Sequence, residues 1–412
     1  MIPQFVVIGA GVIGITTALE LQRRGQFVLV LDRKGVAEET SAGNAGAFAF
    51  SEVEPLATPG IMRKAPKWLL DPLGPLSIPP AYALQIVPWM YRFWRASRPD
   101  YYKASLSAQA GLMELSREAL ERLVPMVKAE PLLQRDGQMQ LYESEAEFRA
   151  SLPNWHIRRE HGVEFELLES PAAIAEKQPG LSTRFTHAGF TPNWLNTADP
   201  KKWVDHLAQI FCDRGGQIER QDIRALAPLE NGVRITFSDG TLDVSKAVIA
   251  AGAWSHHIAR TLGDRIPLET ERGYNTTLPE GAFDLRTHLT FSRHGFVASK
   301  INGGVRVGGA VELGGLTLPP NFKRAEILLR KAAEFMPGLK TEGGTQWMGF
   351  RPSMPDSIPV ISVSPNAPSV VYAFGHGHLG LTQSAGTAEL VGAMIDGAET
   401  PISLAPYSAT RF

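Results

Sequence analysis

An α/β fold built as two domains is predicted by three features of this sequence. The chain has 412 residues, and a single domain typically holds about 100–200, so two or more structural units are expected. A strand–turn–helix–strand pattern stands at the N-terminus. Between residues 217 and 254, short strands separated by turn residues follow one another, which is typical of an antiparallel sheet.

The N-terminal pattern is a β-α-β unit. Residues 4–8 (QFVVI) and 27–32 (FVLVLD) are short runs of β-branched, aromatic and aliphatic residues, as buried parallel strands require. Residues 15–25 (ITTALELQRRG) lie between them and have a helical pattern that ends at a glycine. The unit predicts the start of a parallel sheet.

Three glycines connect the first strand to the helix. Gly9, Gly11 and Gly14 form G-x-G-x-x-G, in which the first permits a tight turn, the second lets the backbone approach a pyrophosphate, and the third lets helix and strand pack closely. Asp32 ends the second strand, where a carboxylate accepts hydrogen bonds from a ribose 2′-hydroxyl. The unit therefore predicts a bound dinucleotide, and Asp32 argues against NADP because it would repel a 2′-phosphate.

Helices and hairpins follow in the middle of the chain. Residues 105–127 and 198–213 are predicted helices, the second with Asp199 as N-cap and Pro200 at its first position, and a last helix is expected near residues 383–396. Residues 217–227, 232–239 and 242–254 are predicted to form one β-meander, because ENG and DG between them are typical hairpin turns.

The composition excludes several classes of function. With 41 basic and 42 acidic residues, the net charge of −1 provides no general attraction to nucleic acid. The single cysteine, Cys212, permits no intramolecular disulfide and fits a reducing, cytoplasmic location. No apolar run reaches the ~18 residues of a membrane-spanning helix. No cluster of residues has metal-ligand spacing, and no G-x-S-x-G motif follows a strand.

Two glycine-rich loops favour a flavin over NAD. The first follows Asp32 and is small and polar, and the second precedes the last helix, whose N-terminal amides would face the negative charge that a reduced flavin carries at N1 and the C2 carbonyl. Cofactor contacts at both ends of the chain are hard to explain with NAD. The loops contain Thr40, Ser41, Gly43, Asn44 and Gly46, and Gly375, Gly377 and Gly380.

The sequence resembles the D-amino-acid dehydrogenase branch, of the small-subunit type, of the FAD-dependent D-amino-acid oxidase and glycine oxidase superfamily. The resemblance runs nearly end to end. The stretches that carry it are VVIGAGVIGI…VLVLDR, ETSAGNAG, VIAAGAWS at residues 248–255, and GFRPSMPDSIPVI followed by FGHGHLGLT at residues 349–382.

This resemblance implies the domain organisation. A Rossmann-like FAD-binding domain is expected from residues 1–80, 191–265 and 346–412. A discontinuous antiparallel-sheet substrate domain is expected from residues 81–190 and 266–345.

The resemblance also implies the FAD-binding residues. Arg33 is expected against the adenine, with a surface position as the alternative. The expected set is Gly9, Gly11, Val12, Ile13, Gly14, Asp32, Arg33, Thr40, Ser41, Asn44, Ala45, Gly46, Ala251, Gly252, Trp254, Arg351, Gly377, His378, Leu379, Gly380, Leu381 and Thr382.

Two residues are expected to act on the substrate. Relatives hold the substrate carboxylate with the arginine at the position of Arg351, and a planar guanidinium meets a carboxylate through two parallel hydrogen bonds. The hydroxyl of Tyr274 is expected to share the carboxylate, or else to be a buried hydroxyl bonded to the backbone. His376 and His378 are interpreted as structural rather than as general bases.

The expected reaction is the oxidative deamination of a D-amino acid. A hydride passes from Cα to flavin N5, and the imine hydrolyses to a keto acid. Glu52 and Glu54 differ from the residues of familiar relatives. The identity of the amino acid therefore stays open, and proline-type D-amino acids such as cis-4-hydroxy-D-proline are among the candidates. The alternative is that both lie in a solvated loop.

Three assignments of the electron acceptor remain open. The leading one is a dehydrogenase that passes electrons to a quinone or another carrier. The alternatives are an oxidase of glycine, sarcosine or a D-amino acid that uses oxygen, and a flavin-binding subunit that is inactive without its partner. The sequence does not decide the oligomeric state.

Residues 80–98 (PAYALQIVPWMYRFWRASR) suggest peripheral membrane contact. Aromatic side chains beside arginines are typical of an interfacial helix, and the related dehydrogenases are peripheral to the inner face of the cell membrane. The alternative is a helix packed on the substrate domain with its arginines reaching water. Pro88 is expected to interrupt the segment.

Overall fold

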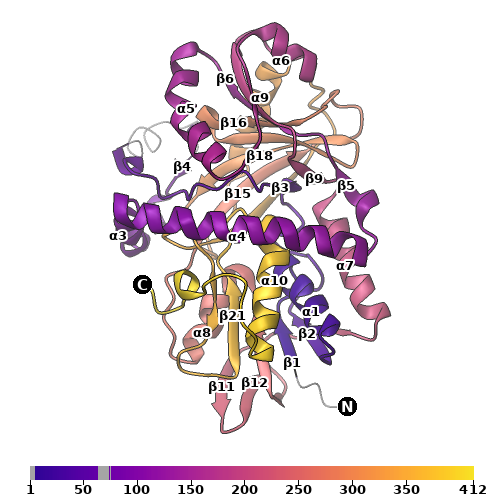
Figure 1. The fold of residues 1–412 in the computed structure, drawn as a ribbon, viewed down its shortest axis with the longest axis vertical. Coiled ribbons are helices and arrows are strands. Elements are labelled where there is room, and N and C mark those ends of the chain that lie inside the picture. The colour runs from indigo at the N-terminus through magenta and orange to yellow at the C-terminus, as the bar shows by residue number, and fades with distance from the viewer. Residues whose placement is uncertain (1–4, 64–73, 75) are drawn as a thin grey trace.

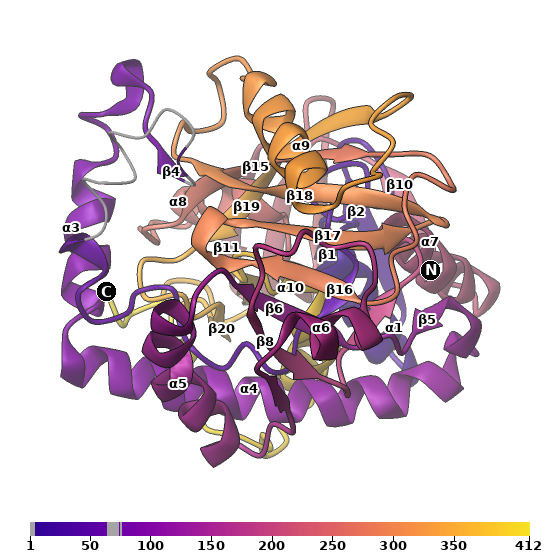
Figure 2. The same ribbon diagram turned by 90° about the horizontal axis from the view of Figure 1, so that it is seen from above.

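The computed structural model describes residues 5–63, 74 and 76–412 of the chain. Figure 1 shows two stacked halves, a lower one around a six-stranded sheet and an upper one around a nine-stranded sheet. Helix α4 (Pro99–Met126) crosses the molecule where the halves meet, and the view from above shows it spanning the full width (Figure 2).

The six-stranded sheet contains the predicted β-α-β unit. Its first five strands are parallel, and β20 pairs antiparallel at one edge. Residue 4, predicted in the first strand, lies outside the described residues. In spatial order the strands are β10 (Gln217–Arg220), β2 (Val28–Asp32), β1 (Phe5–Ile8), β14 (Lys246–Ile249), β21 (Val370–Phe374) and β20 (Val360–Val363).

Both faces of this sheet are buried, which explains why its strands are continuously apolar. Val7 faces a helical layer, whereas Val6 and Ile8 face the opposite layer. The helical layer is α1 (Val12–Arg23), α7 (Pro200–Asp213), α10 (Gly380–Asp396) and α4. The opposite layer is a three-stranded sheet, β11 (Ala225–Leu229), β12 (Gly232–Thr236) and β13 (Thr241–Val244), with α8 (Ser255–Thr261).

The predicted single meander is wrong at both of its ends. Residues 217–220 form β10, which pairs parallel with β2 in the main sheet, and the chain enters the small sheet only at Ala225. At the other end, β13 stops at Val244 and β14 begins at Lys246 beside β1. Local alternation identifies strands, but it does not show when the chain passes from one sheet to another.

The upper half is mostly antiparallel. Among the strands that the structure describes, only the β16–β6 and β18–β4 pairs of this sheet run parallel. The small helices α5 (Glu145–Glu160), α6 (Pro171–Lys177) and α9 (Lys323–Phe335) belong to this half (Figures 1 and 2). In spatial order the strands are β19 (Thr345–Ser353), β15 (Glu269–Thr277), β18 (Gly304–Glu312), β17 (Phe296–Ile301), β16 (His288–Phe291), β6 (Gln138–Tyr142), β8 (His187–Thr191) and β7 (Glu166–Leu168), with β4 (Leu76–Ser77) beside β18.

A second small sheet lies between the halves (Figure 1). It joins β3 (Ala47–Phe48), β9 (Leu195–Thr197) and β5 (Leu133–Gln134), all antiparallel. Strand β3 follows the first β-α-β unit in the chain. Its pairing with β9 therefore holds this part of the chain between the two halves.

The sheets divide the chain differently from the predicted segments in two places. Strand β19 was placed in the FAD-binding segment 346–412, but it pairs along its whole length with β15 of the upper sheet. Helix α4 was placed in the substrate segment 81–190, but it buries Leu112 and Leu120 in the core of the lower half. Residues 1–4, 64–73 and 75 of the predicted segment 1–80 lie outside the described residues.

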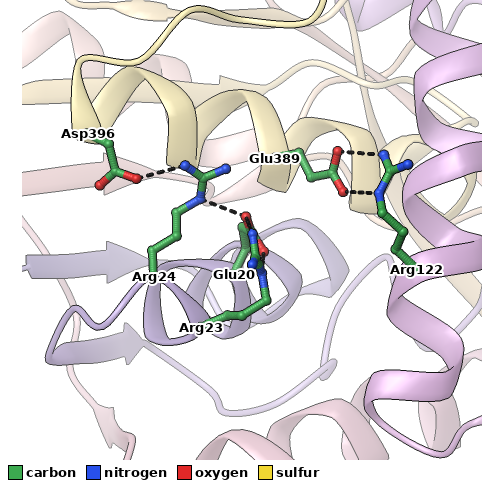
Figure 3. A network of polar contacts seen from close by, with 6 residues as sticks. All are labelled: Glu20, Arg23, Arg24, Arg122, Glu389 and Asp396. Atoms are coloured by element: carbon green, nitrogen blue, oxygen red, sulfur yellow. Dashed lines mark hydrogen bonds and ion pairs between the residues drawn. The ribbon is translucent and has the colours of Figure 1, made fainter.

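Ion pairs fasten the helical layer of the lower half (Figure 3). Arg24 at the end of α1 pairs with Glu20 at 2.7 Å and with Asp396 at the end of α10 at 2.7 Å. Arg122 of α4 donates two hydrogen bonds to the carboxylate of Glu389 on α10, at 2.9 and 2.8 Å. These contacts connect α10 to α1 and to α4, from both of which the sequence separates it by more than 250 residues.

Helix boundaries follow the local sequence signals. Asp199 caps α7 by accepting from the amide of Lys201 at 2.8 Å, as predicted. Helix α4 begins six residues before the predicted start because Pro99 occupies its first turn. Helix α10 begins at Gly380, before the predicted residue 383.

The segment 80–98 is not one interrupted helix. Residues Pro80–Tyr82 form a 3-10 turn, and α3 (Val87–Ala96) begins beside Pro88. Proline has no amide hydrogen to donate, so it fits the first helical turn and starts the helix rather than breaking it. Within the described residues, no helix is both long and apolar enough to cross a bilayer.

Candidate active site

The turn between β1 and α1 is as tight as its glycines predict. Gly9 has φ of +112°, and a Cβ atom there would overlap the carbonyl of Ala250 on the neighbouring chain segment. A Cβ atom at Gly14 would overlap the carbonyl oxygen of Gly9. Larger residues would therefore push α1 away from the sheet, and the amides at its N-terminus would no longer line the cavity below.

Side chains from two other segments complete this turn. One oxygen of Asp32 accepts from the amide of Ala10 at 2.9 Å, which connects the end of β2 to the glycine turn. The hydroxyl of Ser41 accepts from the amide of Val12 at 3.0 Å, at the N-terminus of α1. Both residues also line the cavity described next.

Arg33 stacks on an aromatic ring at the outer end of the site. Its guanidinium carbon lies 3.7 Å from the centroid of the Trp254 ring, and its Nη2 atom pairs with Glu39 at 2.6 Å. The sequence suggested a contact with adenine for Arg33 but gave no sign of Glu39. Because the ion pair and the ring fix the guanidinium, it can form one flat wall of a nucleotide pocket.

A long cavity connects these elements. It passes the carboxyl ends of β2, β1 and β14, which is where open parallel sheets bind nucleotides. The glycine turn, the N-terminus of α1 and Asp32 face it, and backbone amides with a carboxylate suit the pyrophosphate and a ribose of FAD. The predicted cofactor residues in its wall are Gly9, Gly11, Val12, Ile13, Asp32, Arg33, Thr40, Ser41, Asn44, Ala251, Gly252, Trp254, Gly377, Gly380 and Leu381.

A second cavity continues the first beneath the upper sheet. Thr40, Asn44 and Gly377 line both cavities, so a cofactor that fills the first reaches the second. The volume of the second is about 390 Å³, within the ~300–1,000 Å³ of small-molecule sites. Of the predicted site residues, Ala45, Tyr274, Arg351, His378 and Leu379 line this second cavity.

Three predicted cofactor residues lie behind these walls instead. Gly14 serves the packing of α1 described above. Gly46 accepts from the amide of Thr197 at 2.7 Å, and the hydroxyl of Thr382 accepts from the amide of Ala49 at 2.9 Å. Their contacts position the cavity wall without reaching the cavity.

Strand β19 holds the two glycine-rich loops in place. The hydroxyl of Thr40 donates to the carbonyl of Phe350 at 2.7 Å. The amide of Gly377 donates to the carbonyl of Pro352 at 2.7 Å. The residue between these two acceptors is Arg351, so both cofactor loops meet at the arginine that the sequence assigned to the substrate.

Arg351 faces the second cavity across a glycine. A Cβ atom on Gly273 of β15 would overlap the guanidinium, so the glycine provides the space in which Arg351 lies. Its Nη1 atom donates to the carbonyl of Ala310 at 3.1 Å. Burial lowers the pKa of Arg351 from its ordinary value, and the nearby carboxylate of Glu271 opposes that shift. At neutral pH the cavity therefore holds a fixed guanidinium that can bind an anion.

Glu271 is a cavity residue that the sequence reasoning missed. It is the register partner of Arg351 in the β15–β19 pair, lines the same cavity and is 7% exposed. Burial raises its pKa above the ordinary value, whereas the charge of Arg351 acts in the opposite direction. Glu271 and Arg351 are 80 positions apart in the sequence, and only the pairing of their strands brings them together.

Tyr274 lines the cavity, but its hydroxyl is bonded inside the protein. The hydroxyl donates to Glu312 at 3.0 Å and accepts from the amide of Asn321 at 3.0 Å. The side chain is 1% exposed. Of the two predicted roles, this arrangement matches the buried tyrosine and leaves no free hydroxyl for a substrate carboxylate.

The histidines near the C-terminal loop are uncharged at neutral pH. His376 is buried beside Thr387, with 2.9 Å between its Nε2 atom and the hydroxyl, and burial lowers its pKa to about 3. His378 lines the second cavity, and burial lowers its pKa to about 4. His376 therefore has a structural contact, whereas His378 presents a neutral imidazole to the cavity.

The two unusual glutamates have different positions. Glu52 lines the second cavity and lies 3.4 Å from Arg158. Glu54 points away and accepts from the hydroxyl of Tyr102 at 3.0 Å. Of the two, Glu52 therefore borders the second cavity, and its side chain is still 31% exposed.

The chain matches the FAD-dependent oxidoreductase family known as DAO over residues 4–394. It is 34% identical to a D-amino-acid oxidase of Bradyrhizobium diazoefficiens over 98% of both chains. It is 29% identical to a D-amino acid dehydrogenase of Allorhizobium ampelinum, again over 98% of both.

Solved structures have the same fold. Glycine oxidase from Geobacillus kaustophilus superposes with a TM-score of 0.79 at 20% identity, over 100% of this chain and 99% of that one. L-Proline dehydrogenase from P. horikoshii superposes with a TM-score of 0.77 at 18% identity, over 100% and 98%. Together with a glycine turn and a cavity that fit FAD, the match over residues 4–394 shows that this chain is an enzyme of the DAO family of FAD-dependent oxidoreductases.

Proposed function

We propose that this enzyme oxidises the C–N bond of a small D-amino acid. The observation that carries the proposal is the buried guanidinium of Arg351 in a cavity that continues the FAD site. A carboxylate bound there stands at a fixed distance from the cofactor, as an α-amino acid requires. The names of the two relatives, an oxidase and a dehydrogenase of D-amino acids, support the choice of substrate and of hand.

The residues of the chain divide the work between binding and positioning. When bound, FAD would supply the hydride acceptor for oxidation of the substrate C–N bond, and water would hydrolyse the resulting imine to a keto acid. Arg351 binds the carboxylate and fixes which face of Cα is presented. Gly273 keeps the guanidinium in its place, and the neutral His378 adds no competing positive charge.

We also propose a proline-type substrate such as cis-4-hydroxy-D-proline. Glu52 supports this proposal because it lines the second cavity, and a carboxylate can accept a hydrogen bond from a substrate hydroxyl. The expected result is that Glu52→Gln weakens binding of the hydroxylated substrate more than that of D-proline. Equal loss for both substrates would contradict this role of Glu52.

The reaction class is tested by anaerobic reduction of the purified holoenzyme. A panel of D-, L- and N-alkyl amino acids is added, with 2-hydroxy acids as controls that have a carboxylate but no amine. The proposal predicts loss of the oxidised-flavin absorbance with D-amino acids alone. If glycine or sarcosine reduced the flavin faster than the D-amino acids, the glycine-oxidase alternative would be favoured. No reduction by any amino acid, with FAD bound, would contradict the proposal or indicate a missing partner subunit.

We propose a quinone or another carrier as the electron acceptor. The dehydrogenase relative supports this choice, whereas the oxidase relative favours oxygen. Turnover with a soluble quinone and little hydrogen peroxide is the expected result. Peroxide formed in proportion to the substrate consumed would identify an oxidase.

We propose that α3 makes peripheral contact with the inner face of the cell membrane. Tyr91 is 60% and Trp94 is 47% exposed on this helix, next to the exposed Arg92 and Arg95. Exposed aromatic rings with basic neighbours fit an anionic lipid surface. In Figures 1 and 2, α3 lies at one side of the molecule, where a flat surface can reach it.

Vesicle sedimentation tests this membrane contact. The enzyme is expected to sediment with phosphatidylglycerol vesicles and much less with phosphatidylcholine ones. The double substitution Tyr91→Ser with Trp94→Ser should reduce binding about tenfold, whereas Leu152→Ser, at an exposed position of α5, should not. Sedimentation that is unchanged by the double substitution would contradict the proposal.

A further inference from the structure

We propose that Glu271 receives the α-ammonium group of the substrate and removes its proton. The site then recognises both charges of a zwitterion, with Arg351 on the carboxylate and Glu271 on the nitrogen. This inference rests on the proposed function, because it requires that the substrate be an amino acid. It names a further catalytic residue for that reaction.

The geometry of two paired strands carries the proposal. Glu271 of β15 and Arg351 of β19 are directly opposite in the antiparallel register, and both line the second cavity. Directly opposed residues have Cβ atoms roughly 4.5–5.5 Å apart. The two groups nevertheless form no direct ion pair within 4.0 Å. They stand side by side with opposite charges, and each retains bonding capacity toward the cavity.

A purely structural ion pair exists one residue away and looks different. Arg272 and Glu312 are bonded directly at 3.1 Å and are 0% and 3% exposed. Arg272 also donates to the carbonyls of Gly315 at 2.7 Å and Leu318 at 2.7 Å. That pair is satisfied inside the protein. Glu271 and Arg351 form no such direct contact with each other, so a structural salt bridge does not explain their placement.

Glu271 is the carboxylate whose charge acts on Arg351. From β19 it faces Arg351 and the hydroxyl of Ser353, and from the loop before α10 it faces His376 and His378. Both histidines are uncharged at neutral pH, for the reason given above. Glu52 borders the same cavity from the loop after β3 but lies close to Arg158. Apolar side chains that include Leu56 and Phe93 close the space behind.

The proton transfer is balanced in atoms and charge. An N–H bond of the substrate ammonium breaks, its electron pair stays on nitrogen, and an O–H bond forms on Glu271. The amine is then neutral, so its lone pair can form the C=N bond as the Cα hydrogen leaves with two electrons, which reduce the bound FAD. Glu271 returns its proton to solvent once the product has left. Burial raises its pKa toward that of an amine, which makes the transfer easier.

A pair of unreactive ligands tests the inference without turnover. 2-Aminoisobutyrate has the ammonium and the carboxylate but no Cα hydrogen, and isobutyrate has the carboxylate alone. We expect the wild-type holoenzyme to prefer 2-aminoisobutyrate, measured by calorimetry and by the change in flavin spectrum. Glu271→Gln should reduce that preference about tenfold while leaving isobutyrate binding nearly unchanged. The preference should also decrease as the pH falls through the raised pKa of Glu271.

Two further variants keep the comparison interpretable. Glu271→Asp retains the carboxylate and should retain part of the preference. Glu269→Gln removes a half-buried glutamate of the same strand that accepts from Tyr82 at 2.8 Å outside the cavity, and it should change neither ligand. The inference would be overturned if Glu271→Gln left the ratio of the two affinities unchanged, including by weakening both ligands equally. It would also be overturned if the wild-type enzyme bound 2-aminoisobutyrate no more tightly than isobutyrate.

The pH dependence of flavin reduction separates proton removal from simple binding. At saturating D-amino acid, Glu271→Gln should slow reduction about 100-fold at pH 7 and recover toward the wild-type rate near pH 10, where the free amine is already neutral. If Glu271→Gln slowed flavin reduction by the same factor at every pH, proton removal by Glu271 would be contradicted. If no amino acid reduces the wild-type enzyme, the proposed function fails. Amine-dependent ligand binding would then still show whether Glu271 holds an ammonium.

Discussion

At the residue scale, Arg351 connects the cofactor site to the substrate cavity. Its neighbours in the chain, Phe350 and Pro352, hold the two glycine-rich loops through their carbonyls. Its own side chain lies over Gly273 and faces the cavity. The backbone of this strand thus sets the position of the cofactor loops, while one side chain sets the position of the substrate.

Substitution of Arg351 should act on binding of the carboxylate. Arg351→Met removes two charge-assisted hydrogen bonds, worth roughly 1.5–3 kcal/mol each, so kcat/KM should fall at least about 100-fold. Arg351→Lys keeps the charge but loses the planar pair of donors, and a smaller loss of about tenfold is expected. Steady-state kinetics with bound FAD confirmed by its spectrum is the measurement.

A matched surface substitution provides the control. Arg234→Met removes an exposed ion pair with Asp243 on the hairpin of the lower half and should leave kcat/KM unchanged. If Arg351→Met retained wild-type kcat/KM, the carboxylate would be held elsewhere.

Local motifs predicted single residues well where the structure around the residue depends on nearby positions in the sequence. Gly9, Gly14 and Asp32 occupy the positions that their spacing indicates, because a turn, a helix start and a strand end are local structures. Glu271 and Glu39 were missed because their partners come from strand register and from a side-chain stack. For Glu271, the pairing of β15 with β19 is the signal that would have identified it.

At the element scale, the packing of α1 on β1 controls the cofactor site. The helix presents its N-terminal amides to the cavity only while Gly14 lets it touch the backbone of Gly9. The ion pairs at the far end of α1 connect it to α10, whose own N-terminus starts at the other glycine-rich loop (Figure 3). The two helices therefore hold both cofactor loops from one layer.

Gly14→Ala is predicted to damage both stability and FAD binding. The added methyl group overlaps a backbone oxygen, so the helix must shift at a cost of ~1–3 kcal/mol. Thermal unfolding and FAD titration measure the two effects. Gly111→Ala is the control, because no atom lies within 4 Å of the added carbon in α4 and helix propensity predicts a gain of about 0.5–1 kcal/mol. Similar outcomes for both variants would contradict the packing role of Gly14.

Elements were easier to predict from the sequence than the sheets that they join. The pattern indicated strands at residues 217–220 and 246–249, yet it did not show that these pair parallel with β2 and β1. The same limit applies to β19, which carries Arg351 and belongs to the upper sheet. Pairing depends on long-range packing that no local window contains.

At the scale of the whole molecule, the two halves meet around one continuous cavity. Thr40, Asn44 and Gly377 border both of its parts, and α4 crosses the boundary (Figure 1). A cofactor bound along this cavity contacts strand ends of the lower sheet and the underside of the upper sheet. FAD is therefore expected to stabilise the protein as well as to supply its chemistry.

Removal of FAD should lower the thermal stability. A ligand that binds only the folded state contributes about 2.7 kcal/mol when its free concentration is 100 times Kd. The apoprotein should consequently show a lower Tm, which rises as FAD is added and does not respond to NAD. An identical Tm with and without FAD would contradict a cofactor site that joins the halves.

The most direct test of the central claim is stopped-flow reduction of the flavin by the two enantiomers of one amino acid, proline, without oxygen. We expect rapid loss of the oxidised-flavin absorbance with D-proline, at least about 100-fold slower reduction with L-proline, and loss of the D-proline reaction in Arg351→Met. Equal reduction by both enantiomers, faster reduction by L-proline, or reduction that does not depend on Arg351 would contradict that claim.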